Sequence, residues 1–233
     1  VAIPFLITDY SKEILQEYPP ILGTYYQGNY SDCSSSGKLP ENFYQSLKSG
    51  CYGGLLKLTS LFQTKQLVEL FSKFGFFSSP KIGLTTNQIT LPNTKMNSNA
   101  LLIGKNQIRV SPLQIAIATS SFSNQGYIPN PIIIKTIRTE IQSWDIFSQN
   151  MPREILPKSA ANNIIESFIS QKIDGWEFTV LTYDQKGIYS WYISGTLGEG
   201  KGKPLVMVIV LEEKNPSYVE YIGREIFKAA HSQ

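Results

Sequence analysis

The chain has 233 residues, of which 42% are hydrophobic and 12% aromatic, and its formal net charge is +3 at pH 7. This length suits one large domain or two small ones and can bury a substantial core. The small, evenly spread charge argues against nucleic acid or an anionic membrane as the partner. No apolar run approaches the length of a membrane span, and we expect any signal or anchor to lie upstream of Val1.

The first half of the chain is predicted to be helical, with long connections. Periodic apolar residues predict helices at 4–16, 40–61 and 65–74, and the last of these ends at Gly75, which suits a helix C-terminus. Residues 18–38 are rich in Pro, Gly, Ser and Tyr and are predicted to form a loop. Tyrosines cluster there, and the sequence leaves open whether they pack locally or anchor a protein partner: Tyr25, Tyr26 and Tyr30.

The chain contains two cysteines, Cys33 and Cys51, separated by a serine-rich stretch and the start of a predicted helix. In an oxidising compartment, a disulfide closing a loop of this size would add about 3 kcal/mol of stability. The alternative is two unrelated thiols, with Cys51 a small core residue. Because the sequence does not fix the geometry that a disulfide needs, both interpretations stay open.

The clearest local signal is residues 101–118, LLIGKNQIRVSPLQIAIA. Ser111 followed by Pro112 predicts a helix start, because a serine N-cap accepts an orphan amide and proline fits the first turn. Apolar residues then recur at helical spacing and predict a broad buried face: Leu113, Ile115, Ile117, Ala118 and Phe122.

The second half of the chain changes to strand patterns. A turn is predicted at 126–131, a β-prone run at 131–137 and a helix at 159–171. Strands are predicted at 176–183, 188–194 and 204–211, and the last is apolar throughout, which is typical of a central strand covered on both faces. A closing helix at 216–230 is expected to turn four apolar residues inward: Val219, Ile222, Ile226 and Ala230.

This order predicts an α+β fold in which an antiparallel sheet is packed by helices, and a single domain over residues 1–233. Several segments, taken in order, resemble the transpeptidase domain of penicillin-binding proteins. Residues 103–126 are similar to that family's segment IGqG…vtPLQlA…faNgG, and further similar segments lie at 42–58, 71–83, 191–195 and 205–212 and in the closing helix. The resemblance implies a β-lactamase/transpeptidase-like α/β sandwich without a cofactor, cut on its N-terminal side near the catalytic helix.

Catalysis in that family depends on three motifs around one cleft. In S-x-x-K, a serine nucleophile is followed one helical turn later by the lysine that takes its proton. An S-x-N motif supplies a second hydroxyl and an amide. A K-[ST]-G motif on a strand edge binds the substrate carboxylate and helps to form the oxyanion hole.

The first motif is not intact at the matched position. The apolar pair that follows S-x-x-K in the family corresponds to Pro4 and Phe5, which puts Ile3 where the lysine should stand and the serine before Val1. A literal S-x-x-K occurs at residues 35–38, in a polar loop close to the next motif. We interpret this second occurrence as a chance match.

The S-x-N motif has also lost its functional groups. Aligning the flanking leucines puts Gly50, Cys51 and Tyr52 on the motif, and these residues offer neither the hydroxyl nor the amide. A register shifted by one residue keeps Ser49 but still lacks the asparagine.

For K-[ST]-G, the matched residues are Trp176, Glu177 and Phe178. Phe178 would also obstruct the close backbone approach that glycine permits. The aromatic pair either lines the former cleft as a contact surface or packs within it, and we favour packing. A rival register at 193–196 keeps Ser-Gly-Thr with isoleucine in place of lysine, but leaves one strand before the closing helix where the family has two.

Because all three motifs are altered, the resemblance implies a domain without catalysis that serves a structural or protein-interaction role in peptidoglycan synthesis or cell division. Its expected place is outside the cytoplasmic membrane, anchored through an upstream segment, with cell-wall or division proteins or peptidoglycan peptides as partners. One alternative is an active D,D-transpeptidase or carboxypeptidase in another register, using Ser49, Thr179 or Ser194. Another is a reversible sensor of wall peptides or β-lactams.

Three other sequence patterns are weaker evidence for a function. Residues 195–201 fit GxxxxGK, but the next residue is glycine and the predicted flanks are two strands, so we expect a hairpin loop. His231 is the only histidine, which argues against a Ser-His-Asp triad or a histidine metal site. Four acids near strand ends are expected to be solvated surface charges: Asp174, Glu177, Asp184 and Glu199.

Overall fold

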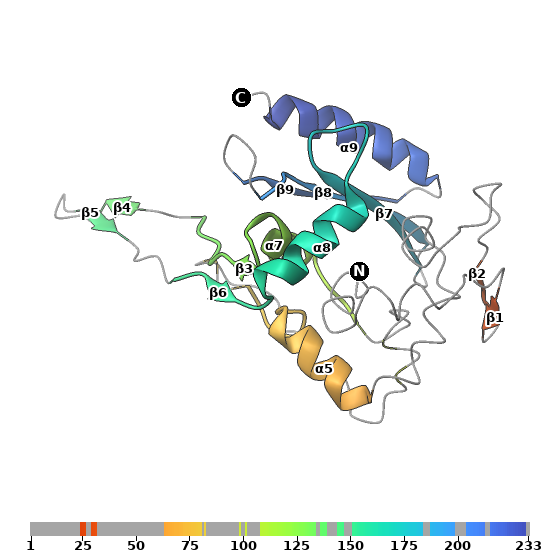
Figure 1. The fold of residues 1–233 in the computed structure, drawn as a ribbon, viewed down its shortest axis with the longest axis horizontal. Helices are drawn as coiled ribbons and strands as arrows, with labels where there is room; N and C mark the ends of the chain where they lie inside the picture. The colour runs from red at the N-terminus through yellow and green to blue at the C-terminus, as the bar shows by residue number, and fades with distance from the viewer. Residues whose placement is uncertain are drawn as a thin grey trace.

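The computed structural model describes residues 24–26, 29–31, 63–80, 82, 98, 101, 108–133, 136–138, 144–146, 151–183, 187–198, 204–212 and 215–231. Figure 1 shows the elements along the chain. The helices are α5 (Thr64–Lys73), α7 (Pro112–Ser123), α8 (Lys158–Phe168) and α9 (Pro216–His231). The strands are β1 (Thr24–Tyr26), β2 (Asn29–Ser31), β3 (Tyr127–Ile128), β4 (Thr136–Arg138), β5 (Trp144–Ile146), β6 (Arg153–Glu154), β7 (Trp176–Tyr183), β8 (Ile188–Gly195) and β9 (Val206–Leu211).

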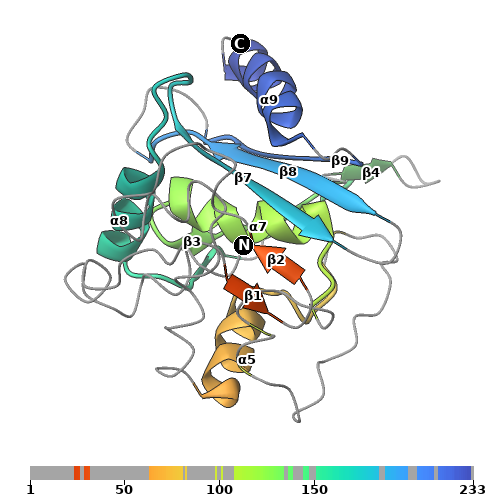
Figure 2. The ribbon, with the colours of Figure 1, turned by 90° about the vertical axis from the view of Figure 1, so that its right-hand side faces the viewer.

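A three-stranded antiparallel sheet in the order β7-β8-β9 forms the middle layer. Helix α9 covers one face, and α7 and α8 lie against the other (Figures 1 and 2). The expected α+β fold, an antiparallel sheet packed by helices, is therefore confirmed. Within the described chain, no helix is both long and apolar enough to cross a membrane.

The alternation along β7 divides its side chains between the two faces of the sheet. Trp176 and Phe178 belong to the core cluster on the side of α7 and α8. Glu177, between them, turns to the other face and meets Arg224 of α9. The register with β8 places Glu177 opposite Ser194 and Phe178 opposite Ile193, so Ser194 shares the α9 face while Ile193 joins the core.

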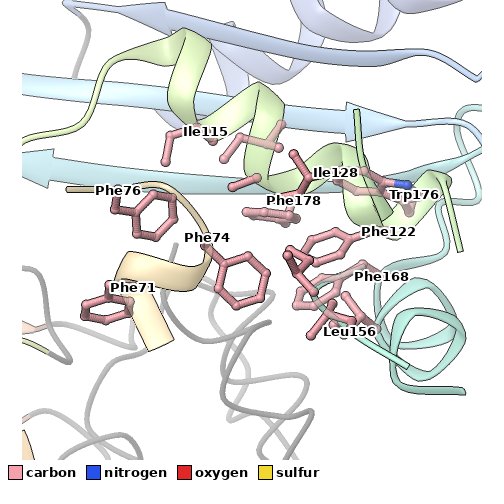
Figure 3. Packing of buried hydrophobic residues seen from close by; sticks show 14 of the residues in the cluster. Phe71, Phe74, Phe76, Ile115, Phe122, Ile128, Leu156, Phe168, Trp176 and Phe178 are labelled. Carbon is pink, nitrogen blue, oxygen red and sulfur yellow. The ribbon is translucent and has the colours of Figure 1, made fainter. Parts of the chain in front are cut away.

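The core is mainly aromatic where the sheet meets α7 and α8 (Figure 3). Ring centroids of Trp176 lie 5.5 Å from Phe122 and 5.9 Å from Phe178, and Phe178 lies 5.1 Å from Phe168. These separations are typical of favourable aromatic pairs, which add to the free energy of burial. The core therefore joins α7, α8 and β7 through a chain of touching rings.

The predicted start of α7 is confirmed. Ser111 Oγ accepts from the Gln114 amide at 3.2 Å, and Gln114 Oε1 accepts from the Ser111 amide at 2.9 Å, which completes a capping box. The Gln114 carboxamide also donates to the carbonyls of Gly75, Phe76 and Ser78 at 3.1–3.2 Å, which ties the turn after α5 to α7. Gly75 has φ +83, as expected of a glycine that ends a helix.

Some expected boundaries are wrong. The predicted loop at 18–38 contains the β1–β2 pair, and the turn expected at 126–131 contains β3, which pairs with β6. Helix α8 ends at Phe168, not at 171, because the Ser170 amide bonds to the Gly175 carbonyl in a loop that leads into β7. In each case the backbone finds a partner that local periodicity does not reveal.

Two predictions about burial are also wrong. In the described sheet β8 is central, whereas β9 pairs with β8 alone and all its residues are partly exposed. Leu113, placed in the buried face of α7, is 38% exposed, while Ile115, Ala118 and Phe122 are fully buried as predicted. Leu113 lies in the first turn of the helix, ahead of the stripe that packs against the core.

The buried face of α9 agrees with the prediction at Val219 and differs from it at Ile226 and Ala230. Its buried residues are Val219, Gly223 and Phe227, spaced four apart, whereas Ile226 is 48% exposed. A side chain at Gly223 would overlap the ring of Tyr192 on β8, so the glycine lets the helix lie directly on the tyrosine. Because glycine carries no apolar side chain, a hydrophobicity pattern does not place it in the buried stripe.

We predict that Gly223→Ala destabilises the protein by about 1–3 kcal/mol in chemical denaturation, since the new methyl overpacks against Tyr192. Intrinsic helix propensity alone would give the opposite sign, a gain of about 1 kcal/mol. Gly187→Ala is the matched control, because no atom lies within 4 Å of its added Cβ. Equal or greater stability of Gly223→Ala would contradict the close packing.

Candidate functional site

The structure describes one of the three degenerate motif regions. Ile3, Gly50 and Tyr52 lie outside the described residues, as do Cys33 and Cys51, so the first two motifs and the disulfide stay predictions. The K-[ST]-G-like residues are described, on the first three positions of β7.

Trp176 and Phe178 are core residues, 1% and 6% exposed. The Trp176 indole Nε1 donates to Ser123 Oγ at 2.9 Å, and this hydroxyl donates to the Thr196 carbonyl at 2.7 Å. The indole N–H is therefore satisfied inside the fold, and the chain of donors links β7, α7 and the end of β8. Both aromatic side chains fill space beneath the sheet.

Glu177 is 6% exposed and its carboxylate is saturated with donors. Oε1 accepts from Ser170 Oγ at 2.6 Å and from Arg224 Nη2 at 3.0 Å. Oε2 accepts from Tyr192 Oη at 2.8 Å and from Arg224 Nε at 2.9 Å. The guanidinium thus holds the carboxylate through two nitrogens, the geometry in which arginine binds carboxylates most strongly. Arg224 Nη2 also lies 3.2 Å from Glu220 Oε2.

The network shifts the proton affinity of each member. Burial raises the pKa of Glu177, but hydrogen bonds from Arg224, Ser170 and Tyr192, with the charge of Arg224, outweigh it and leave the pKa below the usual 4.5. Burial, followed by the hydrogen bond to Glu177 and its charge, raises the pKa of Tyr192 above its usual range. The hydrogen bond to Glu177 raises the pKa of Arg224. The carboxylate therefore stays ionised and the phenol stays protonated.

Glu177 is consequently not the solvated surface acid that the sequence indicated. Its partner Arg224 is 47 positions away, and no spacing rule connects a strand residue with a helix residue at that separation. Asp174 does fit the expectation, with an 81% exposed side chain that lies 3.6 Å from His231 Nε2. Asp184 and Glu199 lie outside the described residues.

The alternative nucleophiles are placed differently. Ser194 is fully buried on the sheet face under α9, and Thr179 on the same face is partly buried. Ile193, the lysine position of the rival register, is fully buried in the core. Gly195 of the GxxxxGK pattern is the last residue of β8, and the next described element after residues 196–198 is the strand β9, not a helix. Ser49 lies outside the described residues.

The side chains of Trp176, Glu177 and Phe178 therefore hold β7, α7, α8 and α9 together. At these three positions no amine or hydroxyl is offered to a ligand. Within the described residues, no group of three or more His, Cys, Asp or Glu side chains is arranged to hold a metal ion.

The family model described as the penicillin binding protein transpeptidase domain matches residues 13–195. The chain belongs to the penicillin-binding protein transpeptidase domain family. No curated protein matches its sequence.

Solved structures agree on the fold. Penicillin-binding protein A from M. tuberculosis, as its imipenem acyl-enzyme complex, superposes with a TM-score of 0.78 at 15% identity, over 98% of this chain and 58% of that one. The D,D-transpeptidase domain of a peptidoglycan glycosyltransferase from Eggerthella lenta superposes with a TM-score of 0.72 at 12% identity, over 97% of this chain and 63% of that one. Penicillin-binding protein 3 from M. tuberculosis superposes with a TM-score of 0.68 at 12% identity, over 91% of this chain and 55% of that one. This chain spans about three-fifths of these structures.

We predict that Glu177→Gln lowers the free energy of unfolding by about 1.5–3 kcal/mol at pH 7, because Arg224 loses the carboxylate that binds it through two nitrogens and keeps the more exposed contact with Glu220. Since the folded pKa of Glu177 lies below 4.5, the contribution is complete above that pH and is lost as pH falls through the folded pKa. The difference between wild type and variant should therefore shrink in acid-range denaturation curves.

The matched control is Glu225→Gln, which removes an exposed carboxylate from its contact with Lys228 on the same helix. Exposed pairs of this kind contribute about 0–1 kcal/mol. A difference for Glu177→Gln that stays constant from pH 7 to pH 3 would contradict the assignment of an ionised, paired carboxylate.

Proposed function

We propose that this chain is a non-catalytic domain of the penicillin-binding protein type, with a structural or protein-interaction role in peptidoglycan synthesis or cell division. The observation that carries the proposal is the use of the K-[ST]-G-like residues inside the fold. Trp176 and Phe178 pack in the core, and the ionised Glu177 carboxylate is paired with Arg224.

The chemistry of the motif explains why this matters. A substrate carboxylate needs a cationic or hydroxyl donor on the strand, and a nearby oxyanion needs positive potential. An ionised Glu177 supplies negative charge, and its lone pairs already accept from four donor atoms: Ser170 Oγ, Tyr192 Oη, Arg224 Nε and Arg224 Nη2. Loss of one member of a cooperating catalytic set costs several orders of magnitude in rate, so loss at matched positions supports absence of turnover.

The similar structures support the cellular setting. They include a penicillin-binding protein in an acyl-enzyme complex with imipenem and the D,D-transpeptidase domain of a peptidoglycan glycosyltransferase. We infer from this kinship that the present chain works outside the cytoplasmic membrane, beside cell-wall or division proteins or peptidoglycan peptides.

We predict that incubation of the full-length protein with excess penicillin leaves its intact mass unchanged, because an acyl adduct needs an activated serine. Mass spectrometry measures this directly, with a competent D,D-transpeptidase domain treated in parallel as the control. An increase by one drug molecule would overturn the proposal in favour of an active transpeptidase, and peptide mapping would then identify the acylated residue.

A calorimetric titration with a D-Ala-D-Ala peptide distinguishes the two non-catalytic roles, scaffolding and reversible sensing of wall peptides. A structural or scaffolding domain gives no saturable heat. Saturable binding without turnover would replace the scaffold role with reversible sensing of wall peptides.

A further inference from the structure

The loop between α8 and β7, residues 169–175, is attached to α9 along the second half of that helix. Ser170 Oγ donates to Glu177 Oε1, which Arg224 of α9 also holds. One turn further on, the Phe227 ring lies 3.2 Å from the position that a Cβ on Gly175 would occupy. At the end of the helix, His231 Nε2 lies 3.6 Å from Asp174 Oδ2. Three successive contacts therefore tie one loop to one helix.

Ser170 also determines the shape of the loop itself. Its hydroxyl accepts from the amides of Lys172 and Ile173 at 2.9 and 3.2 Å, and its own amide donates to the Gly175 carbonyl at 2.9 Å. The hydroxyl donates its one proton to Glu177. The loop is thus folded around the same hydroxyl that bonds to the carboxylate.

The apolar attachment of α9 is narrow. The helix buries Val219, Gly223 and Phe227, of which the glycine contributes no side chain. Tyr218, Tyr221 and Ile226 are exposed. A helix with two fully buried apolar side chains, Val219 and Phe227, has limited hydrophobic burial to hold it, and the hydrogen-bonded ion pair of Arg224 with Glu177 adds to its attachment.

We propose that α9 is a latch, and that the Arg224–Glu177 pair is the contact that closes it on the α8–β7 loop and the first residues of β7. When α9 detaches, the Glu177 carboxylate loses Arg224 and is no longer held in position to accept the hydrogen bond from Ser170. The α8–β7 loop and the first residues of β7 then open together. By linkage, a partner that binds α9 more tightly when it is detached would open the β7 end, and a ligand that binds the open β7 end more tightly would loosen α9 by the same coupling free energy. The latch does not depend on whether the domain is catalytic.

Native-state hydrogen exchange on the full chain tests the latch. In Arg224→Gln, amides of 169–178 and of α9 should exchange faster by about tenfold or more, while α7 and α8 keep their wild-type rates. Lys228→Gln is the matched control, since it removes the exposed pair with Glu225 on the same helix and should change neither segment. An increase confined to α9, or spread equally over α7 and α8, would overturn the proposal.

Ser170→Ala separates the loop from the helix. It keeps the ion pair and removes the hydroxyl that joins the loop to the carboxylate, so exchange should rise in 169–175 while α9 keeps its protection. Unchanged exchange in the loop would overturn the role of Ser170 in the latch.

Wild-type exchange under increasing denaturant keeps the proposal testable if the arginine variant does not fold. Amides of α9, the loop and the first residues of β7 should merge into one opening transition below that of global unfolding. Separate transitions for the helix and the loop would contradict a single latch.

Discussion

The packing of α9 on the sheet and on the α8–β7 loop depends on the buried carboxylate of Glu177. A charge can remain between a sheet and a helix when a cation and neutral donors satisfy its oxygens. That requirement brings Arg224 from α9, Tyr192 from β8 and Ser170 from the loop to one point. The position of α9 over the sheet follows, with Gly223 resting on the tyrosine ring.

One short stretch of β7 serves both layers of the fold. Trp176 packs edge-on against Phe122 of α7 and Phe178 packs at a tilt against Phe168 of α8, while Glu177 between them binds the sheet to α9. In a strand, such alternation is a geometric necessity, because successive side chains leave opposite faces. Where this stretch of strand carries K-[ST]-G, its residues would contact a ligand. In the present chain the side chains at these positions instead pack in the core or pair with Arg224.

The fold was largely predictable because its signals are local. The N-cap at Ser111, the glycine at Gly75 and the alternation of helix and strand patterns each depend on neighbours within a few positions, and each is found in the structure. The run from 103 to 126 was specific enough to indicate the family that the match over residues 13–195 establishes. The burial of Trp176 and Phe178 agreed with ordinary packing of aromatic side chains.

The sequence by itself determined the α+β class, the family and the order of the elements from α8 to α9, since periodicity, caps and motif order are properties of contiguous residues. Tertiary structure alone decided that Glu177 is ion-paired, that α9 buries Gly223 in place of Ile226, and that β8 is central in the described sheet. The ion pair joins residues 47 positions apart, and Gly223 packs on Tyr192 of a different element. A single sequence carries no local signal for such pairings, because they arise when separate elements pack and their polar groups must find partners.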